Sequence, residues 1–273
     1  MEIKRGQVAV VTGGGSGIGR GISLAAADEG MNVVVADIEE AAAERVAEEV
    51  RAKGGQAIAS QTDVTSLEDV KETADRAFSE FDSVHLLCNN AGVSTFKPMV
   101  EQTPDDWRWV LSVNLDGVVN GILAFLPRLV EQSDESHIVS TASTAGLIPI
   151  PELGIGPYTA SKYAIVGISE KLRGEVDGNG IGVSVLCPGG VRTNLMTSER
   201  NRPTELGGTG KASENILAGG KDPLEVGRLV LAGVKANQAY MFTDLTIEDA
   251  VEARFKAIKA GFAATRELLE KGV

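Results

Sequence analysis

The chain has 273 residues, of which 43% are hydrophobic and 23% are charged, as in an ordinary soluble globular protein. Its net charge of −12 argues against nucleic acid or an anionic membrane as a partner, because both would repel it. No apolar run approaches the roughly 18 residues of a membrane span, and the first residues enter a strand pattern without a secretory signal. Two cysteines and two histidines argue against a disulfide framework or an ordinary zinc site. We expect a cytoplasmic protein that binds no metal, nucleic acid or membrane.

Short apolar runs alternate with longer helical patterns along the whole chain. The runs are continuous in their apolar character, which is typical of parallel strands covered on both faces. The expected strands are 7–12, 31–37, 56–60, 84–89, 137–142, 181–187 and 239–243. This alternation predicts one α/β domain spanning 1–273, with a doubly wound, seven-stranded parallel sheet and helices on both faces.

The segments between the strands carry start and stop signals of helices. In chain order these signals are Gly54-Gly55 after 38–53, Ser66 with Asp69, Thr103-Pro104, Asp222-Pro223, and Thr246 with Asp249. The last signal predicts a C-terminal helix over about 246–271. One polar, glycine-rich stretch at 194–221 is long for a connection in a compact domain. We expect it to be a lid over the substrate, with a plain surface insertion as the alternative.

Residues 12–19 (TGGGSGIG) form a glycine-rich turn between the first strand and the first helix. Gly13, Gly17 and Gly19 would bring backbone N–H groups to a pyrophosphate at the helix N-terminus. Asp37 ends the second strand, 18 residues after Gly19, near the distance expected for a carboxylate that binds a ribose. Asp37 also suits a helix N-cap, and the two roles are compatible.

Tyr158 and Lys162 are four residues apart, so in a helix they lie on one face. An ammonium near a phenol lowers the pKa of the phenol, and such a Tyr can exchange a proton with a substrate oxygen. Ser143 closes a predicted strand at the edge where open α/β sheets bind ligands. Each residue alone has an ordinary structural explanation, as an amphipathic pair or as a cap.

Taken together, these residues resemble the short-chain dehydrogenase/reductase family, from about residue 5 to 195. The further matches are the NNAG motif at Asn89-Asn90-Ala91-Gly92, the Asp63-Val64 pair, Asn114, and the PGxVxT segment with Pro188, Gly189, Val191 and Thr193. The resemblance implies a single-domain Rossmann fold that binds NAD and interconverts a secondary alcohol and a ketone.

The resemblance also implies roles for individual residues. Tyr158 would be the acid/base, Lys162 would bind the nicotinamide ribose and lower the pKa of Tyr158, Ser143 would steady the reacting oxygen, and Asn114 would support a water. The cofactor-binding residues would be Gly13, Ser16, Gly17, Ile18, Gly19, Asp37, Asp63, Val64, Asn90, Ala91, Gly92, Tyr158, Lys162, Pro188, Gly189, Val191 and Thr193.

Cofactor choice, assembly and substrate follow as expectations. Asp37 should prefer NAD to NADP, because its carboxylate can accept both ribose hydroxyls and would repel a 2′-phosphate. The residues after it, 38–40, offer no compensating cation, and the nearest candidate is Arg20 on the glycine-loop helix. The helices near 104–131 and 157–176 carry more apolar positions than one buried face needs, so we expect a homodimer or homotetramer. The proline-rich stretch 147–155 should form a stiff apolar wall beside a bulky aryl, alicyclic or steroid-like substrate.

Three departures and two alternatives stand beside this reading. The stretch 147–155 looks longer than usual for the family. The last strand lacks the common ending and is followed by a helix, which puts the usual tetramer contact in doubt. The stretch WRWVLSVNLDGVVNGILAFLPRL through RNRP is most similar to a subgroup with bacterial dehydrogenases of lignin-derived aryl alcohols. The alternatives are a dinucleotide-sensing protein, which would lack Tyr158 or Lys162, and an epimerase or dehydratase, which would carry a different glycine loop.

Overall fold

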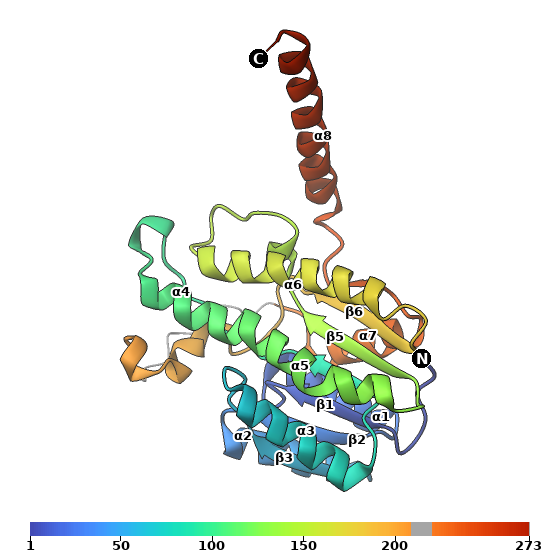
Figure 1. The fold of residues 1–273 in the computed structure, drawn as a ribbon. Coiled ribbons are helices and arrows are strands. Elements are labelled where there is room, and N and C mark those ends of the chain that lie inside the picture. The colour runs from blue at the N-terminus through green and yellow to red at the C-terminus, as the bar shows by residue number, and fades with distance from the viewer. Residues whose placement is uncertain (209–219, 273) are drawn as a thin grey trace.

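The computed structural model describes residues 1–208 and 220–272, and its seven strands form one parallel sheet (Figure 1). The strands are β1 (Val8–Thr12), β2 (Asn32–Asp37), β3 (Ala57–Gln61), β4 (Leu86–Asn89), β5 (Ser136–Thr141), β6 (Ile181–Cys187) and β7 (Tyr240–Phe242). Their order is β3-β2-β1-β4-β5-β6-β7, so the chain changes direction across the sheet between β1 and β4. Ligands of such sheets bind at the carboxyl ends of the strands beside that point. The predicted fold class is confirmed.

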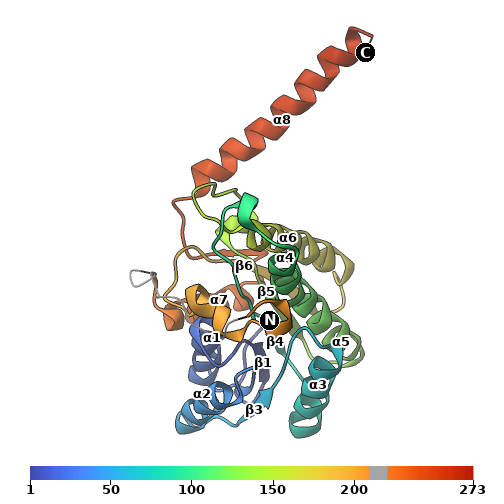
Figure 2. The same cartoon turned by 90° about the vertical axis from the view of Figure 1, so that its left-hand side faces the viewer.

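Helices cover both faces of the sheet. Those of the globular body are α1 (Gly17–Asp28), α2 (Glu40–Ala52), α3 (Leu67–Phe81), α4 (Pro104–Leu111), α5 (Gly117–Glu131), α6 (Gly156–Glu175) and α7 (Pro223–Lys235). Figure 2 shows α1, α2 and α7 on one side of the sheet and α3, α5 and α6 on the other. A further helix, α8 (Glu248–Glu270), extends away from the body.

The core has two layers, one on each face of the sheet. Ala9 and Val11 of β1 pack with α1 and α7, whereas Val8 and Val10 pack towards α3 and α5. All four are at most 1% exposed. Successive strand residues point to opposite faces, so a strand covered on both sides needs an apolar residue at every position. This explains the continuous apolar runs in the sequence.

Most of the predicted helix ends are present. Gly54 follows α2 with a φ of +85°, and Asp222 accepts a hydrogen bond from the Leu224 N–H at the start of α7. Thr103 and Asp106 form a reciprocal capping box at the start of α4. The predicted cap of the last helix is wrong. The Thr246 hydroxyl donates to Asp244 instead, and α8 begins two residues later.

The stretch Pro104–Glu131 is long and apolar enough to cross a membrane, with a mean hydropathy of 1.6 over its best window. The expectation that no stretch has this composition is therefore wrong. In the structure this stretch is α4, a π-helical turn (Ser112–Asp116) and α5, and Phe125 and Leu129 are buried in the core. It behaves as a core helix of a soluble protein. On its outer face Leu123 and Val130 remain about half exposed.

Candidate active site

The glycine turn after β1 is shaped by close backbone approaches. Gly13 and Gly17 have φ values of +62° and +50°, which favour glycine. A Cβ on Gly19 would lie 2.1 Å from the Gly13 carbonyl oxygen, so no larger residue fits there. The turn therefore leads directly into the N-terminus of α1, where backbone N–H groups favour an anion.

Asp37 lies at the carboxyl end of β2, beside this turn. One of its carboxylate oxygens accepts a hydrogen bond from the Gly15 N–H and the other from the Glu39 N–H, both at 2.9 Å. Burial raises the pKa of Asp37, and these two bonds oppose the rise. The bond to Glu39, two residues on, joins Asp37 to the entry of α2. The carboxylate thus has a local structural role. It also lines a cavity that extends from the glycine turn to Tyr158 and Lys162.

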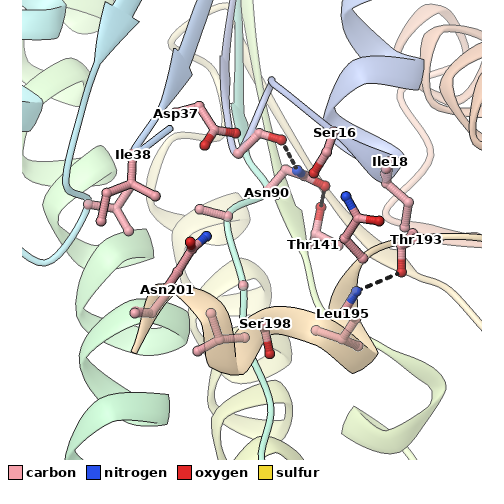
Figure 3. Close-up of a pocket in the computed structure, with 18 of the residues that line it drawn as sticks. Ser16, Ile18, Asp37, Ile38, Asn90, Thr141, Thr193, Leu195, Ser198 and Asn201 are labelled. Carbon is pink, nitrogen blue, oxygen red and sulfur yellow. Dashed lines mark hydrogen bonds between the residues drawn. The ribbon is translucent and has the colours of Figure 1, made fainter. Parts of the chain in front are cut away.

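Asn90 connects the ends of three strands. Its amide nitrogen donates to the Thr12 carbonyl at 3.0 Å, and its amide oxygen accepts from the Thr141 hydroxyl at 3.2 Å. Figure 3 shows Asn90 between the glycine turn and Thr141 at the bottom of the cavity. Thr12 and Thr141 were not among the predicted site residues, although each is the last residue of its strand.

Ser143, which follows β5, faces Tyr158 in the first turns of α6. The Ser143 hydroxyl donates to the Pro188 carbonyl at 3.4 Å and accepts from the Ala145 N–H at 3.1 Å. Burial raises the pKa of Tyr158, and the nearby Ser143 hydroxyl opposes this rise. The direction differs from the one that the family resemblance implies, because desolvation of the phenolate outweighs the attraction of neighbouring groups.

Lys162 lies one turn after Tyr158 on the same face of α6, as predicted. Its Nζ is 5.3 Å from the centroid of the Tyr158 ring and donates to the Thr141 carbonyl at 2.7 Å. The residue is 2% exposed, and burial lowers the pKa of Lys162 to about 7. Gly92 separates Lys162 from Asn114, since a Cβ on Gly92 would lie 3.5 Å from the Lys162 Nζ and 3.4 Å from the Asn114 Oδ1.

Asn114 is held by its amide at the π-helical turn between α4 and α5. Its oxygen accepts from the Val93 N–H at 2.8 Å, and its nitrogen donates to the Val93 carbonyl and the Ser161 hydroxyl. The extra residue of a π turn changes which side chains face inwards, and such turns are frequent at functional sites. Here the turn directs Asn114 towards α6.

The remaining predicted cofactor residues line the same cavity, apart from Gly19, which is buried behind it. Asp63 and Val64 lie beyond β3, and the Val64 carbonyl accepts a hydrogen bond from Asn120. Gly189 donates to the Thr243 hydroxyl after β7, and Thr193 packs against Gly17. The structure brings together the predicted residues Gly13, Ser16, Gly17, Ile18, Asp37, Asp63, Val64, Asn90, Ala91, Gly92, Tyr158, Lys162, Pro188, Gly189, Val191 and Thr193.

A short helical segment, η4 (Leu195–Asn201), lines one side of the cavity. We call η4 the covering segment. It belongs to the predicted lid 194–221, of which 209–219 lie outside the described residues. The hydroxyl of Ser198, in its middle, accepts a hydrogen bond from the Ser94 N–H at 3.1 Å and donates to the Ser94 carbonyl at 3.2 Å. Figure 3 shows Leu195, Ser198 and Asn201 along the side of the cavity opposite Asp37 and Asn90.

Two arginines in this region, Arg200 and Arg202, form ion pairs with the body of the protein. Arg200 pairs with Glu39 at 2.7 Å, and Asn201 donates to the same carboxylate at 2.9 Å. Arg202, which is 7% exposed, pairs with the fully buried Asp106 at 2.7 Å. Lys97 reaches the same carboxylate at 3.0 Å.

Two sequence expectations need correction. Arg20 is not the nearest cation to Asp37, because it pairs with Glu49, whereas Arg200 is close enough to lower the pKa of Asp37. The stretch 147–155 does not line the cavity. It folds onto the loop after β4 instead, where the Lys97 N–H donates to the Gly154 carbonyl. The apolar lining near Tyr158 comes from Val93, Trp109, Val113 and Leu195.

The model of the short chain dehydrogenase family matches residues 7–204. The chain belongs to the short-chain dehydrogenase/reductase family. It is therefore an oxidoreductase with an NAD-binding Rossmann fold.

Solved and curated members of this family are similar over nearly the whole chain. A short-chain dehydrogenase/reductase from Burkholderia phymatum, solved in complex with NAD, is 35% identical with a TM-score of 0.89, covering 96% of this chain and 97% of that one. The C alpha-dehydrogenase of Sphingobium sp. SYK-6 is 33% identical over 94% of this chain and 87% of its own length. The 1-deoxy-11-beta-hydroxypentalenate dehydrogenase of Streptomyces exfoliatus is 35% identical over 87% of this chain and 83% of its own length.

Proposed function

We propose that this chain interconverts a bulky, largely apolar secondary alcohol and its ketone, with NAD(H) as the cofactor and Tyr158 as the acid/base. The observation that carries the proposal is the convergence of Ser143, Tyr158 and Lys162 at one edge of the sheet. Tyr158 and Lys162 line the same cavity as the glycine turn, and Ser143 lies close to Tyr158.

The residues present fit NAD. The glycine turn leaves backbone N–H groups and the N-terminus of α1 open to a pyrophosphate, and a Cβ at Gly13 would lie 2.9 Å from the Ala91 Cα. The Asp37 carboxylate is placed to accept the ribose hydroxyls and to repel a 2′-phosphate. The nearest cation, Arg200, is already paired with Glu39. These contacts support NAD over NADP.

When bound, the nicotinamide ring supplies the hydride acceptor or donor. The Tyr158 hydroxyl exchanges a proton with the substrate oxygen, and the Ser143 hydroxyl orients that oxygen. A cationic Lys162 favours the Tyr158 phenolate and so opposes the effect of burial. Asn114 bonds both to Val93 in the loop after β4 and to Ser161 on α6. These bonds fix the position of the loop relative to α6, beside Lys162.

The lining near Tyr158 supports an apolar substrate. Val93, Trp109, Val113 and Leu195 present aliphatic and aromatic surface there, and apolar pockets select apolar ligands. The relatives named as a C alpha-dehydrogenase and a dehydrogenase of a hydroxypentalenate agree with oxidation of a CH–OH group. The resemblance of residues 107–129 and 200–203 to a subgroup with dehydrogenases of lignin-derived aryl alcohols agrees with the same substrate class.

The test is NADH formation from a bulky aryl or cyclic secondary alcohol, compared with 2-propanol and glycerol. Tyr158→Phe should lower kcat about 10²–10⁴-fold while NADH still binds, because only the proton carrier is lost. Tyr163→Phe, which removes a hydroxyl from the same helix, is the matched control and should keep most of the activity. Near-normal turnover in Tyr158→Phe would end the mechanism. Higher kcat/KM on glycerol than on the bulky alcohol would end the substrate proposal alone.

A further inference from the structure

Helix α8 extends from the body without packing on it. None of its 23 residues is buried, and only Val251 and Arg254 are partly buried. A helix of this length spans about 34 Å. Both cartoon views show α8 pointing away from the sheet and its covering helices (Figures 1 and 2).

The sequence of α8 is amphipathic, unlike that of a freely solvated helix. Val251, Phe255, Ile258, Phe262 and Leu269 recur at spacings of four, three, four and seven residues, which place them on one stripe. The last four of these side chains are between 44% and 66% exposed. We call this set the α8 stripe. An exposed stripe of large apolar side chains marks a surface that becomes covered.

Within residues 1–208 and 220–272, α8 contacts the body through its first turns. The Arg254 guanidinium lies 5.0 Å from the centroid of the Tyr163 ring on α6. From Phe255 to the end of the helix every residue is exposed in the structure of residues 1–208 and 220–272. The direction of α8 is thus set at its base, and its own body does not cover the stripe.

A second exposed apolar surface lies on the same side of the molecule as the base of α8. It consists of Phe96, Met99, Val100 and Leu153, which are 41%, 64%, 90% and 50% exposed. We call it the rim patch. Its two loops are joined by the hydrogen bond from the Lys97 N–H to the Gly154 carbonyl. In Figures 1 and 2 these loops lie at the end of the body from which α8 extends.

The two surfaces differ in charge. Between 253 and 266, α8 carries Arg254, Lys256, Lys259 and Arg266 and no acidic residue, in a chain whose net charge is −12. Lys256 pairs with Glu252 in the preceding turn. The rim patch is flanked by Glu101 and Glu152, which are exposed and form no ion pair among the described residues. The charges therefore favour contact between these surfaces.

We propose that the α8 stripe packs on the rim patch of a second copy of this chain. One chain carries both surfaces, so a two-fold axis satisfies both contacts at once, as in an isologous dimer. Helix α8, which we call the arm, leads away from the rim patch of its own chain. The arm of a second copy that faces this chain would lead back towards that rim patch. Each arm then covers the mouth of the other subunit's cavity, since the rim loop continues directly from Val93 in the cavity lining.

Cross-linking between single-cysteine variants tests the contact without any measurement of activity. The native Cys88 and Cys187 are buried, so an introduced cysteine is the accessible thiol. Phe262→Cys and Val100→Cys, mixed after subunit exchange and treated with a short bismaleimide, should give a covalent dimer that neither variant gives alone. Ala260→Cys, on the opposite face of α8, is the matched control and should give little. Cross-linking of Phe262→Cys with itself would show arm-to-arm pairing and overturn the proposal.

The mass in solution gives an independent test. Phe255→Glu with Phe262→Glu places two carboxylates in the stripe and should lower the mass by light scattering at least two-fold. Ala253→Glu with Ala260→Glu adds the same charges to the opposite face and should leave the mass unchanged. An unchanged mass in the stripe variant would overturn the proposal.

The consequence for the substrate rests on the proposed function. Loss of the arm contact should raise KM for the bulky alcohol several-fold and leave KM for NAD unchanged, because only the cavity mouth is altered. If no secondary alcohol is oxidised, the proposed function fails while the cross-linking result still decides the arm. If the contact fails in an active enzyme, only the arm proposal is lost.

Discussion

Lys162 and Arg202 are both buried cations near the same cavity, but they are held in different ways. Lys162 forms no ion pair with a carboxylate in the described part of the chain, and its Nζ donates to a backbone carbonyl. Burial therefore lowers the pKa of Lys162 to about 7. Arg202 instead meets Asp106, and hydrogen bonds from Thr103, Lys97 and Arg202 hold the pKa of that carboxyl far below its usual value despite its burial.

The difference separates two kinds of electrostatic site. The buried ammonium of Lys162 has no paired carboxylate in the described part of the chain, so it costs stability and changes its charge near neutral pH, which suits a residue that assists proton transfer. The paired charges of Arg202 and Asp106 persist through the working pH range and hold the covering segment on the body. The predictions below change one charge at a time in the two regions.

The largest effect is expected on activity at Lys162. Lys162→Met keeps the length and apolar stem of the side chain but removes the ammonium. We expect kcat to fall about 10²–10³-fold, the loss typical of one electrostatic contact to a developing charge. Steady-state kinetics with NAD and a bulky alcohol measure it. Lys171→Met, an exposed position on the same helix, is the control. Activity near that of the control would show that the ammonium is not used.

Removing Asp106 should cost the most stability. Asp106→Ala removes the fully buried carboxylate partner of Arg202, which keeps only the partly exposed Glu199. It also removes half of a capping box, and the two losses together should lower the free energy of unfolding by about 3–5 kcal/mol. Asp105→Ala removes only an exposed pair with Arg108 and should cost less than about 1 kcal/mol. Urea denaturation compares the two. Equal losses would contradict the clamping role of Asp106.

The same Lys162→Met variant should gain stability while it loses activity. The folded-state pKa of Lys162, about 7, lies below the unfolded value near 10.5, so the folded protein carries the cost of the buried charge at and below pH 7. We expect a gain on the order of 2 kcal/mol at pH 6. As the pH rises from 7 to 10.5, the ammonium is lost in the folded state first and the gain should shrink. Denaturation at pH 6 and pH 10 checks this, and a constant difference would contradict it.

The smallest effect is expected at the partly exposed pair between Glu39 and Arg200. Glu39→Gln keeps the shape but releases Arg200, and we expect KM for NAD to rise about two- to five-fold, as befits a pair worth at most about 1 kcal/mol. The released guanidinium can then meet a 2′-phosphate, so the preference for NAD over NADP should narrow. Glu40→Gln, the next residue, is the control. An unchanged cofactor ratio would show that Arg200 has no part in the choice.

The sequence alone determined the seven-stranded parallel sheet and most of the residues that line the cavity. These features are local: glycines mark close backbone approaches, and Tyr158 and Lys162 share a face because they lie four residues apart on one helix. Ser143, Asp37 and Asn90 each follow or end a strand, and parallel strands bring their carboxyl ends to one edge. The continuous apolar runs predicted that helices cover both faces of the sheet, because alternate residues of a strand point to opposite faces.

Only the tertiary structure decided how the cavity is covered. Glu39 and Arg200 are 161 positions apart, and Asp106 and Arg202 are 96 apart. A charged residue in a polar stretch looks the same in the sequence whether water or a distant carboxylate surrounds it. The proline-rich stretch 147–155 was placed beside the substrate for its composition, yet its backbone pairs with the loop at Lys97 instead. The base of α8 likewise meets α6 through the contact between Arg254 and Tyr163, which no local pattern encodes.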